Sequence, residues 1–407
     1  MWCRPFPLVF GLLAGCGTPV YRCDDPLPPH EAVPAGPFLR QVGTTLVGAD
    51  GAPTTLNGVN LGGWLLWEAW IWGVPLQVWH LDRMSESWMQ SRLVTLYGED
   101  VAAELQARLR AEWVTDADLV AIAAAGFDTV RLPVNHRVLE DETGWALVDG
   151  IVAGADAAGL RVVIDLHGAP GGQSAFFVAD PDPVTLWDDP DARAATVDLW
   201  GAIAARYADA PAVVAYDLLN EPDPPDDEAL IALYVDLIAA VRAEDPDHLV
   251  MLEGSSFARD FTGFTERLDP NMAYQGHLYT SLDGKAEARV AGFAELATCH
   301  DVPVWLGEFG EDDPEYVGGL VSAVEAAGLA GWAFWPWKKV PNGGAPGLRE
   351  IDPPADWITL LEDLTDTEQA PGRLTVDEAR KAVDDFVAAS APERLTAGGM
   401  DAALGVE

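Results

Sequence analysis

Basic residues are scarce in this sequence of 407 residues: Lys and Arg together number 24, against 65 Asp and Glu. The formal net charge is −41 at pH 7, which argues against the electrostatic attraction that nucleic-acid binding requires. The same charge repels the protein from anionic membrane surfaces. We therefore expect a neutral substrate rather than a phosphate-rich one.

Long apolar runs are missing after the N-terminal region, so no transmembrane helix is expected in the mature protein. Near the start, "PFPLVFGLLAG" follows Arg4 and has the length and composition of an export signal. The adjoining "LAGC", ending at Cys16, resembles the lipobox of bacterial lipoproteins, in which the cysteine is lipidated. We expect a signal peptide over residues 1–15 and a lipid-anchored protein facing the periplasm or the cell exterior. An ordinary secretory signal, giving a secreted protein, is the alternative.

Cysteine is also rare, with four in the chain. If Cys3 leaves with the signal and Cys16 is lipidated, Cys23 and Cys299 remain, and outside the cytoplasm they can pair. Two free thiols are the alternative. No cysteine–histidine spacing resembles a zinc site, and we expect neither a metal nor a cofactor.

After an acidic, proline-rich tether over residues 16–40, apolar strand-like runs alternate with helical patterns. Parallel strands need crossover connections, so this alternation predicts a parallel sheet. Eight runs fit an α/β fold, the (β/α)8 TIM barrel, as one domain over residues 41–390 with a tail over 391–407. The runs are "TLNGVNL", "FDTVRLPV", "LRVVIDLHG", "AVVAYDLLN", "HLVMLEG", "MAYQGHLY", "VPVWLGEFG" and "GWAFWPW". A doubly wound open sheet is the alternative, but no glycine-rich phosphate turn follows the first run.

Two segments fall outside the repeating pattern. The tryptophan-rich stretch from Trp64 to Trp113 is longer than one crossover needs, and we expect an elaborated loop there, near the mouth of the barrel. The sequence "TVDEARKAVDDFVAAS" has helical spacing and is expected to form the closing helix of the barrel.

Polar residues at the ends of six predicted strands should converge, because active sites of such barrels lie at the C-terminal ends of the strands. They are Arg131, His167, Asn220 with Glu221, His277 with Tyr279, Glu308, and Trp335. Taken singly, several have plainer explanations: Glu221 as a helix-start acid, Glu308 as a solvated loop acid, His167 as a core histidine.

Two carboxylates on one rim suit glycosidic bond cleavage. One protonates the leaving oxygen, and the other attacks the anomeric carbon or activates water. We expect Arg131 and Tyr279 to keep Glu308 ionised and nucleophilic. We expect burial and the neighbouring anion to raise the pKa of Glu221, as an acid catalyst near neutral pH requires.

The motifs "VRLPV", "IDLHGAPGGQ", "LLNEP", "HLY", "WLGEFG" and "GWAFWPWK" resemble glycoside hydrolase family 5, from about Leu56 to Lys338. The stretches "GVNLGGWLLWEAW" and "DLHGAPGGQ" are most similar to its branch of exo-β-1,3-glucanases. This resemblance implies net retention, with Glu221 as acid/base, Glu308 as nucleophile and Asn220 at the sugar 2-hydroxyl.

The resemblance implies further sugar contacts. His167 and His277 would line the reactive subsite, and Trp335 would stack under the sugar, with Trp337 as the alternative ring. Glu68 matches an acid that contacts the non-reducing sugar, although the branch continues with a proline and an aromatic where this chain has "AW". Residues 176–191 also depart from the asparagine-rich loop of that branch.

We therefore expect a monomeric retaining hydrolase of a β-glucan, exo- or endo-acting on 1,3 or 1,4 links. A mannan or a glycosphingolipid is the alternative substrate within the same clan. A non-catalytic carbohydrate-binding surface lipoprotein is the alternative from another class. The presence of both Glu221 and Glu308 argues against it, because binding alone does not require two such acids.

Overall fold

The computed structural model describes residues 26–29, 36–74, 84–181, 184–279, 286–366 and 368–406. Residues 1–25, with the predicted signal peptide, Cys16 and Cys23, lie outside the described residues, as does most of the predicted tether. Cys299 is disulfide-bonded, so it is not a free thiol, and its partner lies outside the described residues.

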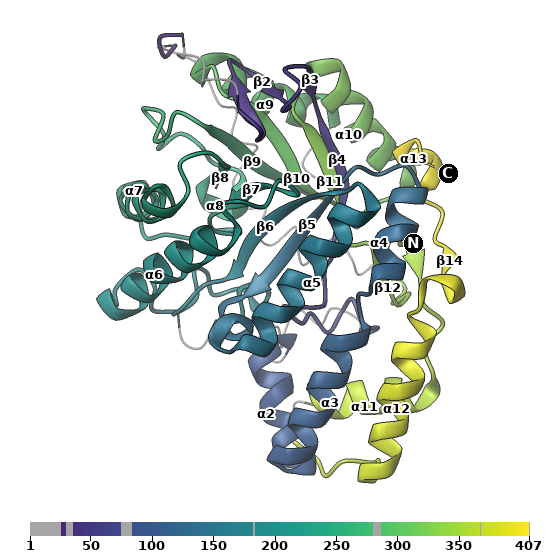
Figure 1. The fold of residues 1–407 in the computed structure, drawn as a ribbon. Helices are drawn as coiled ribbons and strands as arrows, with labels where there is room; N and C mark the ends of the chain where they lie inside the picture. The colour runs from purple at the N-terminus through teal and green to yellow at the C-terminus, as the bar shows by residue number, and fades with distance from the viewer. Residues whose placement is uncertain are drawn as a thin grey trace, which may run out of the picture.

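Eight parallel strands close into a barrel in the order β10-β11-β4-β5-β6-β7-β8-β9 (Figure 1). All eight coincide with predicted runs, so the (β/α)8 prediction is confirmed and the open-sheet alternative is wrong. Their residues are almost all buried, as expected when helices cover the outside and side chains fill the inside. The strands are β4 Leu56–Asn60, β5 Thr129–Asn135, β6 Arg161–Gly168, β7 Val213–Asp217, β8 Leu249–Glu253, β9 Met272–Tyr279, β10 Val304–Gly310 and β11 Gly331–Phe334.

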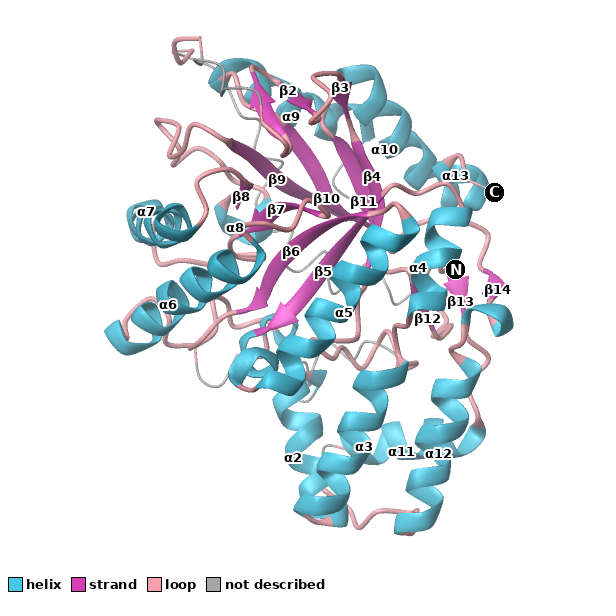
Figure 2. Ribbon diagram, in the orientation of Figure 1, coloured by secondary structure: helices cyan, strands magenta, loops and turns pink. Residues whose placement is uncertain are grey.

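Helices surround this barrel in Figure 2, and several begin at side-chain caps that the sequence supplies. Thr115 and Asp118 form a capping box, and Asp141 and Asp226 accept backbone N–H groups of the first turns that follow them. Gly159 ends its helix at a positive φ of 75°. The barrel helices are α4 Asp116–Ala124, α5 Glu142–Ala158, α6 Pro190–Tyr207, α7 Asp227–Glu244, α9 Ala286–His300 and α10 Pro314–Ala327. Short helices are η2 His136–Glu140, η3 Phe177–Ala179 and α8 Ser255–Ala258.

A separate bundle of four helices lies beside the barrel (Figure 1). It joins α2 Glu86–Tyr97 and α3 Glu99–Glu112, from the insertion after the first barrel strand, to α11 Ala355–Thr365 and α12 Val376–Ala389 near the C-terminus. The ring of Phe386 stacks on Trp357 at 3.6 Å and on Trp113 at 5.4 Å between centroids. The prediction that residues 375–390 form the closing barrel helix is wrong, because α12 packs on α3 and α11 instead.

Small sheets complete the chain. Strands β1 Arg40–Val42, β2 Thr45–Val47 and β3 Pro53–Thr54 form one antiparallel sheet. Strands β12 Lys338–Lys339, β13 Arg349–Glu350 and β14 Thr396–Ala397 form a mixed sheet, in which β12 and β13 pair parallel and β13 and β14 pair antiparallel. The last elements are η5 Pro392–Arg394 and α13 Asp401–Leu404, which packs against α10. Among the described helices, none combines the length and apolarity that a bilayer span requires.

Candidate active site

A pocket opens where the C-terminal ends of the barrel strands meet, and the space inside it is about 430 Å³. Six of the predicted site residues line it, together with Trp70 and a short apolar stretch. The lining residues are Glu68, Trp70, His167, Phe176, Phe177, Val178, Glu221, Tyr279, Glu308 and Trp335.

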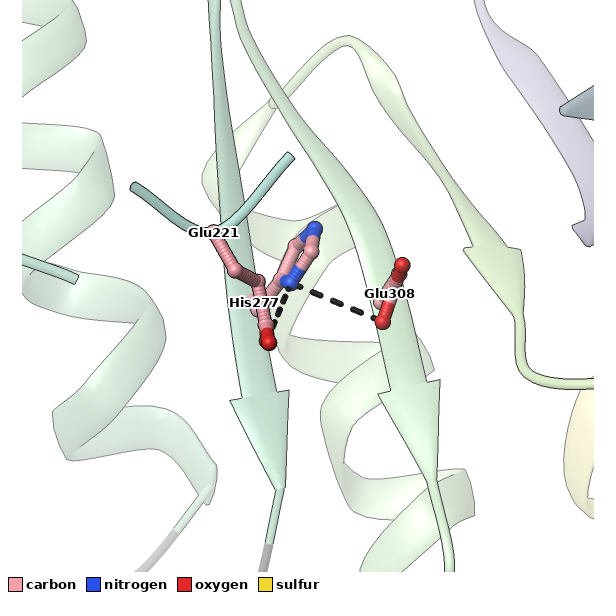
Figure 3. A group of neighbouring side chains, drawn as sticks. All are labelled: Glu221, His277 and Glu308. Carbon is pink, nitrogen blue, oxygen red and sulfur yellow. Dashed lines mark hydrogen bonds and ion pairs between the residues drawn. The ribbon is translucent and has the colours of Figure 1, made fainter. Parts of the chain in front are cut away.

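Strand register brings the two predicted catalytic acids to this pocket. Glu308 lies on β10 directly beside His277 of β9, and Glu221 lies four residues beyond the end of β7. Figure 3 shows His277 between the two carboxylates: its Nδ1 lies 2.9 Å from Glu221 Oε1 and 3.5 Å from Glu308 Oε2. Oxygens of the two carboxylates lie within 4.8 Å of each other. This spacing fits a retaining pair, which is about 5–5.5 Å apart, and not the wider inverting pair.

Glu308 is held from both sides. Arg131 Nη1 donates to Glu308 Oε1 at 2.5 Å, and the Tyr279 hydroxyl donates to Oε2 at 2.6 Å. Arg131 lies in the middle of β5 and is fully buried. Its side chain contacts Asp217 of β7 and Glu308 of β10. Asn60 Oδ1 accepts from the same Nη1 at 3.2 Å, which helps to orient the guanidinium. The predicted contacts of Arg131 and Tyr279 with Glu308 are therefore present.

Asn220 and His167 lie beside this pair. Asn220 Oδ1 accepts from Arg131 Nη2 at 2.8 Å, and its Nδ2 lies 3.4 Å from His167 Nε2. Asp165 Oδ2 lies 2.6 Å from His167 Nδ1. Burial lowers the pKa of His167 to about 3, so this imidazole stays neutral. A neutral ring with Nδ1–H on Asp165 leaves Nε2 as an acceptor toward the pocket.

The expected rise of the Glu221 pKa is wrong. Burial does raise it, but the hydrogen bond and positive charge of His277 outweigh burial, so the pKa of Glu221 is lowered. Burial lowers the pKa of His277, while the carboxylates of Glu253 and Glu308 raise it well above its ordinary value. The positive charge of His277, between the two acids, thus offsets the rise in the Glu221 pKa that was expected from the nearby Glu308 carboxylate.

Backbone geometry also marks Glu221, whose φ is +44°. Residues with a Cβ rarely adopt this left-handed conformation, and where they do the surroundings must hold it. The strain belongs to the turn that directs the Glu221 side chain toward the pocket.

Glu68 lies at the pocket with little exposure. Trp70 Nε1 donates to its Oε2 at 2.7 Å, while Oε1 has no hydrogen-bond partner among the described residues. Burial raises the pKa of Glu68 well above its ordinary value, and the carboxylates of Glu308 and Glu221 add to the rise. An unpartnered oxygen on a residue that lines the pocket is suited to a sugar hydroxyl.

The two candidate stacking rings differ in their position relative to the pocket. Trp335 follows β11, lines the pocket and lies parallel to the His167 ring, with centroids 5.4 Å apart and an interplanar angle of 8°. Trp337 does not line the pocket; its Nε1 donates to Asp118 at 3.0 Å. Trp335 is therefore the ring placed to meet a sugar face.

Three buried acids of the site were not predicted: Asp165, Asp217 and Glu253. Each lies within 3.2 Å of Arg131 Nη2. The signal for Glu253 was present, because it ends the predicted run "HLVMLEG" as other site residues end theirs.

Glu221, His277 and Glu308 each offer one atom that a metal ion would accept, all within 4.8 Å of one another. These three residues are better suited to sharing a proton than to binding a metal ion. The raised pKa of His277 keeps its ring protonated, and a protonated ring has no lone pair for a metal. Arg131 and Tyr279 already bond both oxygens of Glu308.

Known proteins resemble this chain in sequence and in fold. A β-xylosidase from Phanerodontia chrysosporium is 28% identical over 370 residues, covering 80% of this chain and 75% of that protein. A probable glucan 1,3-β-glucosidase A from Aspergillus niger is 28% identical over 361 residues, covering 72% of this chain and 84% of that protein. The solved structure of a β-glucanase from Saccharophagus degradans in complex with cellotetraose shares the fold, with a TM-score of 0.53, 19% identity, and coverage of 77% and 89%.

The family model described as Cellulase (glycosyl hydrolase family 5) matches residues 97–340, more than half of the chain. These residues run from the end of α2 to just past β12 and contain both acids of the pocket. The chain therefore belongs to glycosyl hydrolase family 5 and is a glycosyl hydrolase.

Proposed function

We propose that the protein hydrolyses β-glucosidic bonds of a neutral β-glucan with retention, using Glu308 as nucleophile and Glu221 as acid/base. The observation that carries this proposal is the pair of carboxylates within 4.8 Å of each other at one pocket. In the first step Glu308 attacks the anomeric carbon while Glu221 gives its proton to the departing oxygen. In the second, Glu221 takes a proton from water, which attacks the same carbon and releases Glu308.

The supporting residues divide the remaining work. Arg131 and Tyr279 hold Glu308 as a carboxylate aimed at the pocket. Asn220, His167 and Glu68 offer polar atoms to sugar hydroxyls, and Trp335 offers an apolar face for the ring. Among the described residues that line the pocket there is no Lys or Arg to bind a phosphate, which agrees with a neutral substrate.

The relatives support a pyranoside in β linkage and differ in the sugar. One is named for β-1,3-glucan and the other for a β-xyloside, which lacks the hydroxymethyl group of glucose. The dominance of glucan-named relatives favours glucose as the primary sugar.

The place of action is proposed on separate grounds. The "LAGC" sequence supports a lipid anchor on Cys16, with export to the periplasm or the cell exterior. The disulfide at Cys299 favours an oxidising compartment. We expect the enzyme to act as a monomer that contacts the membrane through this anchor.

Turnover of an aryl β-glucoside tests the function. Glu308→Ala should lose hydrolysis by several orders of magnitude and regain part of it with azide, which replaces the missing nucleophile and gives a glycosyl azide. Glu315→Ala, on the exposed first turn of α10, is the matched control and should keep wild-type activity.

Substrate choice follows from a product profile on laminarin, cellulose oligomers, mannan and a glycosphingolipid, with aryl β-xyloside beside aryl β-glucoside. If the wild-type protein binds glucan but releases no sugar, the hydrolase proposal is wrong and the protein is a carbohydrate-binding protein instead. Preference for mannan or the glycolipid would reassign the substrate while leaving the chemistry in place.

A further inference from the structure

One buried carboxylate, Glu253, contacts several parts of the catalytic apparatus without reaching the pocket itself. It is the last residue of β8, fully buried, and is not among the residues that line the pocket. The Tyr234 hydroxyl of α7 fixes its backbone, accepting the Glu253 N–H at 3.1 Å and donating to its carbonyl at 2.9 Å. Glu253 therefore has a rigid position directly beneath the site.

The first oxygen of Glu253 holds the backbone of the proposed acid/base. Oε2 accepts the N–H of Glu221 at 2.6 Å. This is the residue whose φ is +44°, a conformation that its own sequence does not favour. A hydrogen bond to that N–H offsets the strain and selects the turn that aims the Glu221 side chain.

The second oxygen of Glu253 reaches both cations of the site. Oε1 lies 3.2 Å from Arg131 Nη2 and 3.3 Å from His277 Nε2. Arg131 in turn bonds Glu308, and His277 bonds Glu221. Gln275 pairs with Glu253 in the β8–β9 register and contacts both Glu253 and His277. Its Nε2 lies 2.8 Å from Glu253 Oε1 and 2.9 Å from His277 Nε2.

We propose that Glu253 is a positioning residue that sets the Glu221 carboxyl for proton transfer, through the Glu221 N–H and through His277. The inference rests on the proposed function, because it takes Glu221 as the acid/base. Its link to Glu308 is indirect, through Arg131, which Asp217 also holds by accepting from Nε at 2.9 Å. Loss of Glu253 should therefore impair acid catalysis more than nucleophilic attack.

Leaving-group dependence separates these two effects. When a phenyl β-glucoside is cleaved, the departing phenol oxygen needs a proton. When a dinitrophenyl β-glucoside is cleaved, the dinitrophenolate leaves without one. General acid catalysis contributes about 10²–10⁴-fold, so Glu253→Ala should lower kcat/KM for the phenyl substrate by about that range. For the dinitrophenyl substrate the loss should stay below about tenfold. Glu253→Gln, which keeps the volume and one acceptor oxygen, should show the same pattern with a smaller loss.

Asp217→Asn is the matched control. Asp217 is an equally buried carboxylate on the neighbouring strand β7, and it bonds Arg131 but neither Glu221 nor His277. Because both substrates require the nucleophile that Arg131 holds, this variant should lower kcat/KM for both by a similar factor.

The outcomes are distinct. If folded Glu253→Gln loses activity equally on both substrates, or loses none, the positioning role is wrong, and this variant decides the matter if Glu253→Ala does not fold. If the wild-type protein hydrolyses neither substrate, the proposed function has failed instead. Circular dichroism and thermal unfolding of each variant establish that the compared proteins are folded.

Discussion

At the scale of single residues, His277 determines the direction in which the pKa of Glu221 shifts. It lies between Glu221 and Glu308, and its positive charge lowers the pKa of Glu221. Since Glu221 must carry a proton to begin the reaction, a lowered pKa means that this proton is lost at a lower pH. The free enzyme should therefore work best at acidic pH.

His277→Asn removes the cation, so the pKa of Glu221 should rise. The basic limb of the pH profile of kcat/KM should then move to higher pH, while kcat itself falls by tenfold or more because the site loses a positioned group. The measurement is kcat/KM for an aryl β-glucoside across pH 4 to 9. A basic limb that stays in place or moves to lower pH would show that His277 does not control Glu221.

Tyr279 donates one of the hydrogen bonds that Glu308 receives. A hydrogen bond to a charged group contributes about 1.5–3 kcal/mol, so Tyr279→Phe should lower kcat/KM by about ten- to a hundredfold. Tyr97→Phe is the matched control, because the Tyr97 hydroxyl has no hydrogen-bond partner among the described residues. An equal loss of kcat/KM in the two variants would show that the hydrogen bond from Tyr279 to Glu308 does not contribute to catalysis.

The sequence was sufficient to predict the pocket residues that follow or end a barrel strand, because the barrel topology determines the direction of each apolar run. It did not predict Trp70 or the stretch from Phe176 to Val178, which reach the pocket from connections between the strands. It was insufficient for Asp165 and Asp217, since the sequence alone does not distinguish a buried acid from a solvated one. For Glu253 the one signal was its place at the end of a predicted strand. The pKa of Glu221 was predicted with the wrong sign for a related reason. The charge on His277 depends on Glu253, whose proximity only the folded barrel reveals.

At the scale of elements, the strands were predictable and the four-helix bundle was not. Each barrel strand is a continuous apolar run with a local signature. The bundle instead pairs α2 and α3 with α11 and α12, which lie more than two hundred residues further along the chain. Tryptophans in the insertion suggested a loop at the barrel mouth, and Trp70 does line the pocket there. Trp113, at the far end of the same insertion, instead packs on Phe386 of α12.

Phe386→Ala tests how far the bundle contributes to stability. Removing a fully buried phenyl ring from between Trp113 and Trp357 should lower the free energy of unfolding by about 3–5 kcal/mol. Val235→Ala, on the exposed side of α7, should change it by less than about 0.5 kcal/mol. Denaturant unfolding provides both values. A loss below about 1 kcal/mol for Phe386→Ala would mean that the bundle is not packed as described.

At the scale of the whole molecule, stability should fall as pH rises from about 4 to about 8 and should level off above that. Burial raises the pKa of Asp165 to about 8 and those of Asp217 and Glu253 to about 7, against about 4 in an unfolded chain. Acids with raised pKa values stabilise the fold fully below the unfolded pKa, and this contribution is lost as pH rises through the folded pKa. Glu221 and Asp245 have lowered pKa values and lose their contribution only in strong acid.

Thermal unfolding between pH 5 and pH 9 measures this loss, and salt separates its causes. The net charge of −41 also disfavours the folded state at high pH, but salt screens that surface repulsion. The part of the decline that comes from the three buried acids should persist in high salt. A decline that high salt abolishes would assign the whole effect to surface charge.

The central claim is that Glu308 becomes covalently bound to the sugar during the reaction. The most direct measurement is mass spectrometry of peptides after treatment with an activated β-glucoside in which fluorine replaces the 2-hydroxyl, a change that slows release of the intermediate. We expect one added sugar on the peptide that contains Glu308 and none in Glu308→Ala. A sugar on another residue, or first-formed product with inverted anomeric configuration by NMR, would contradict it.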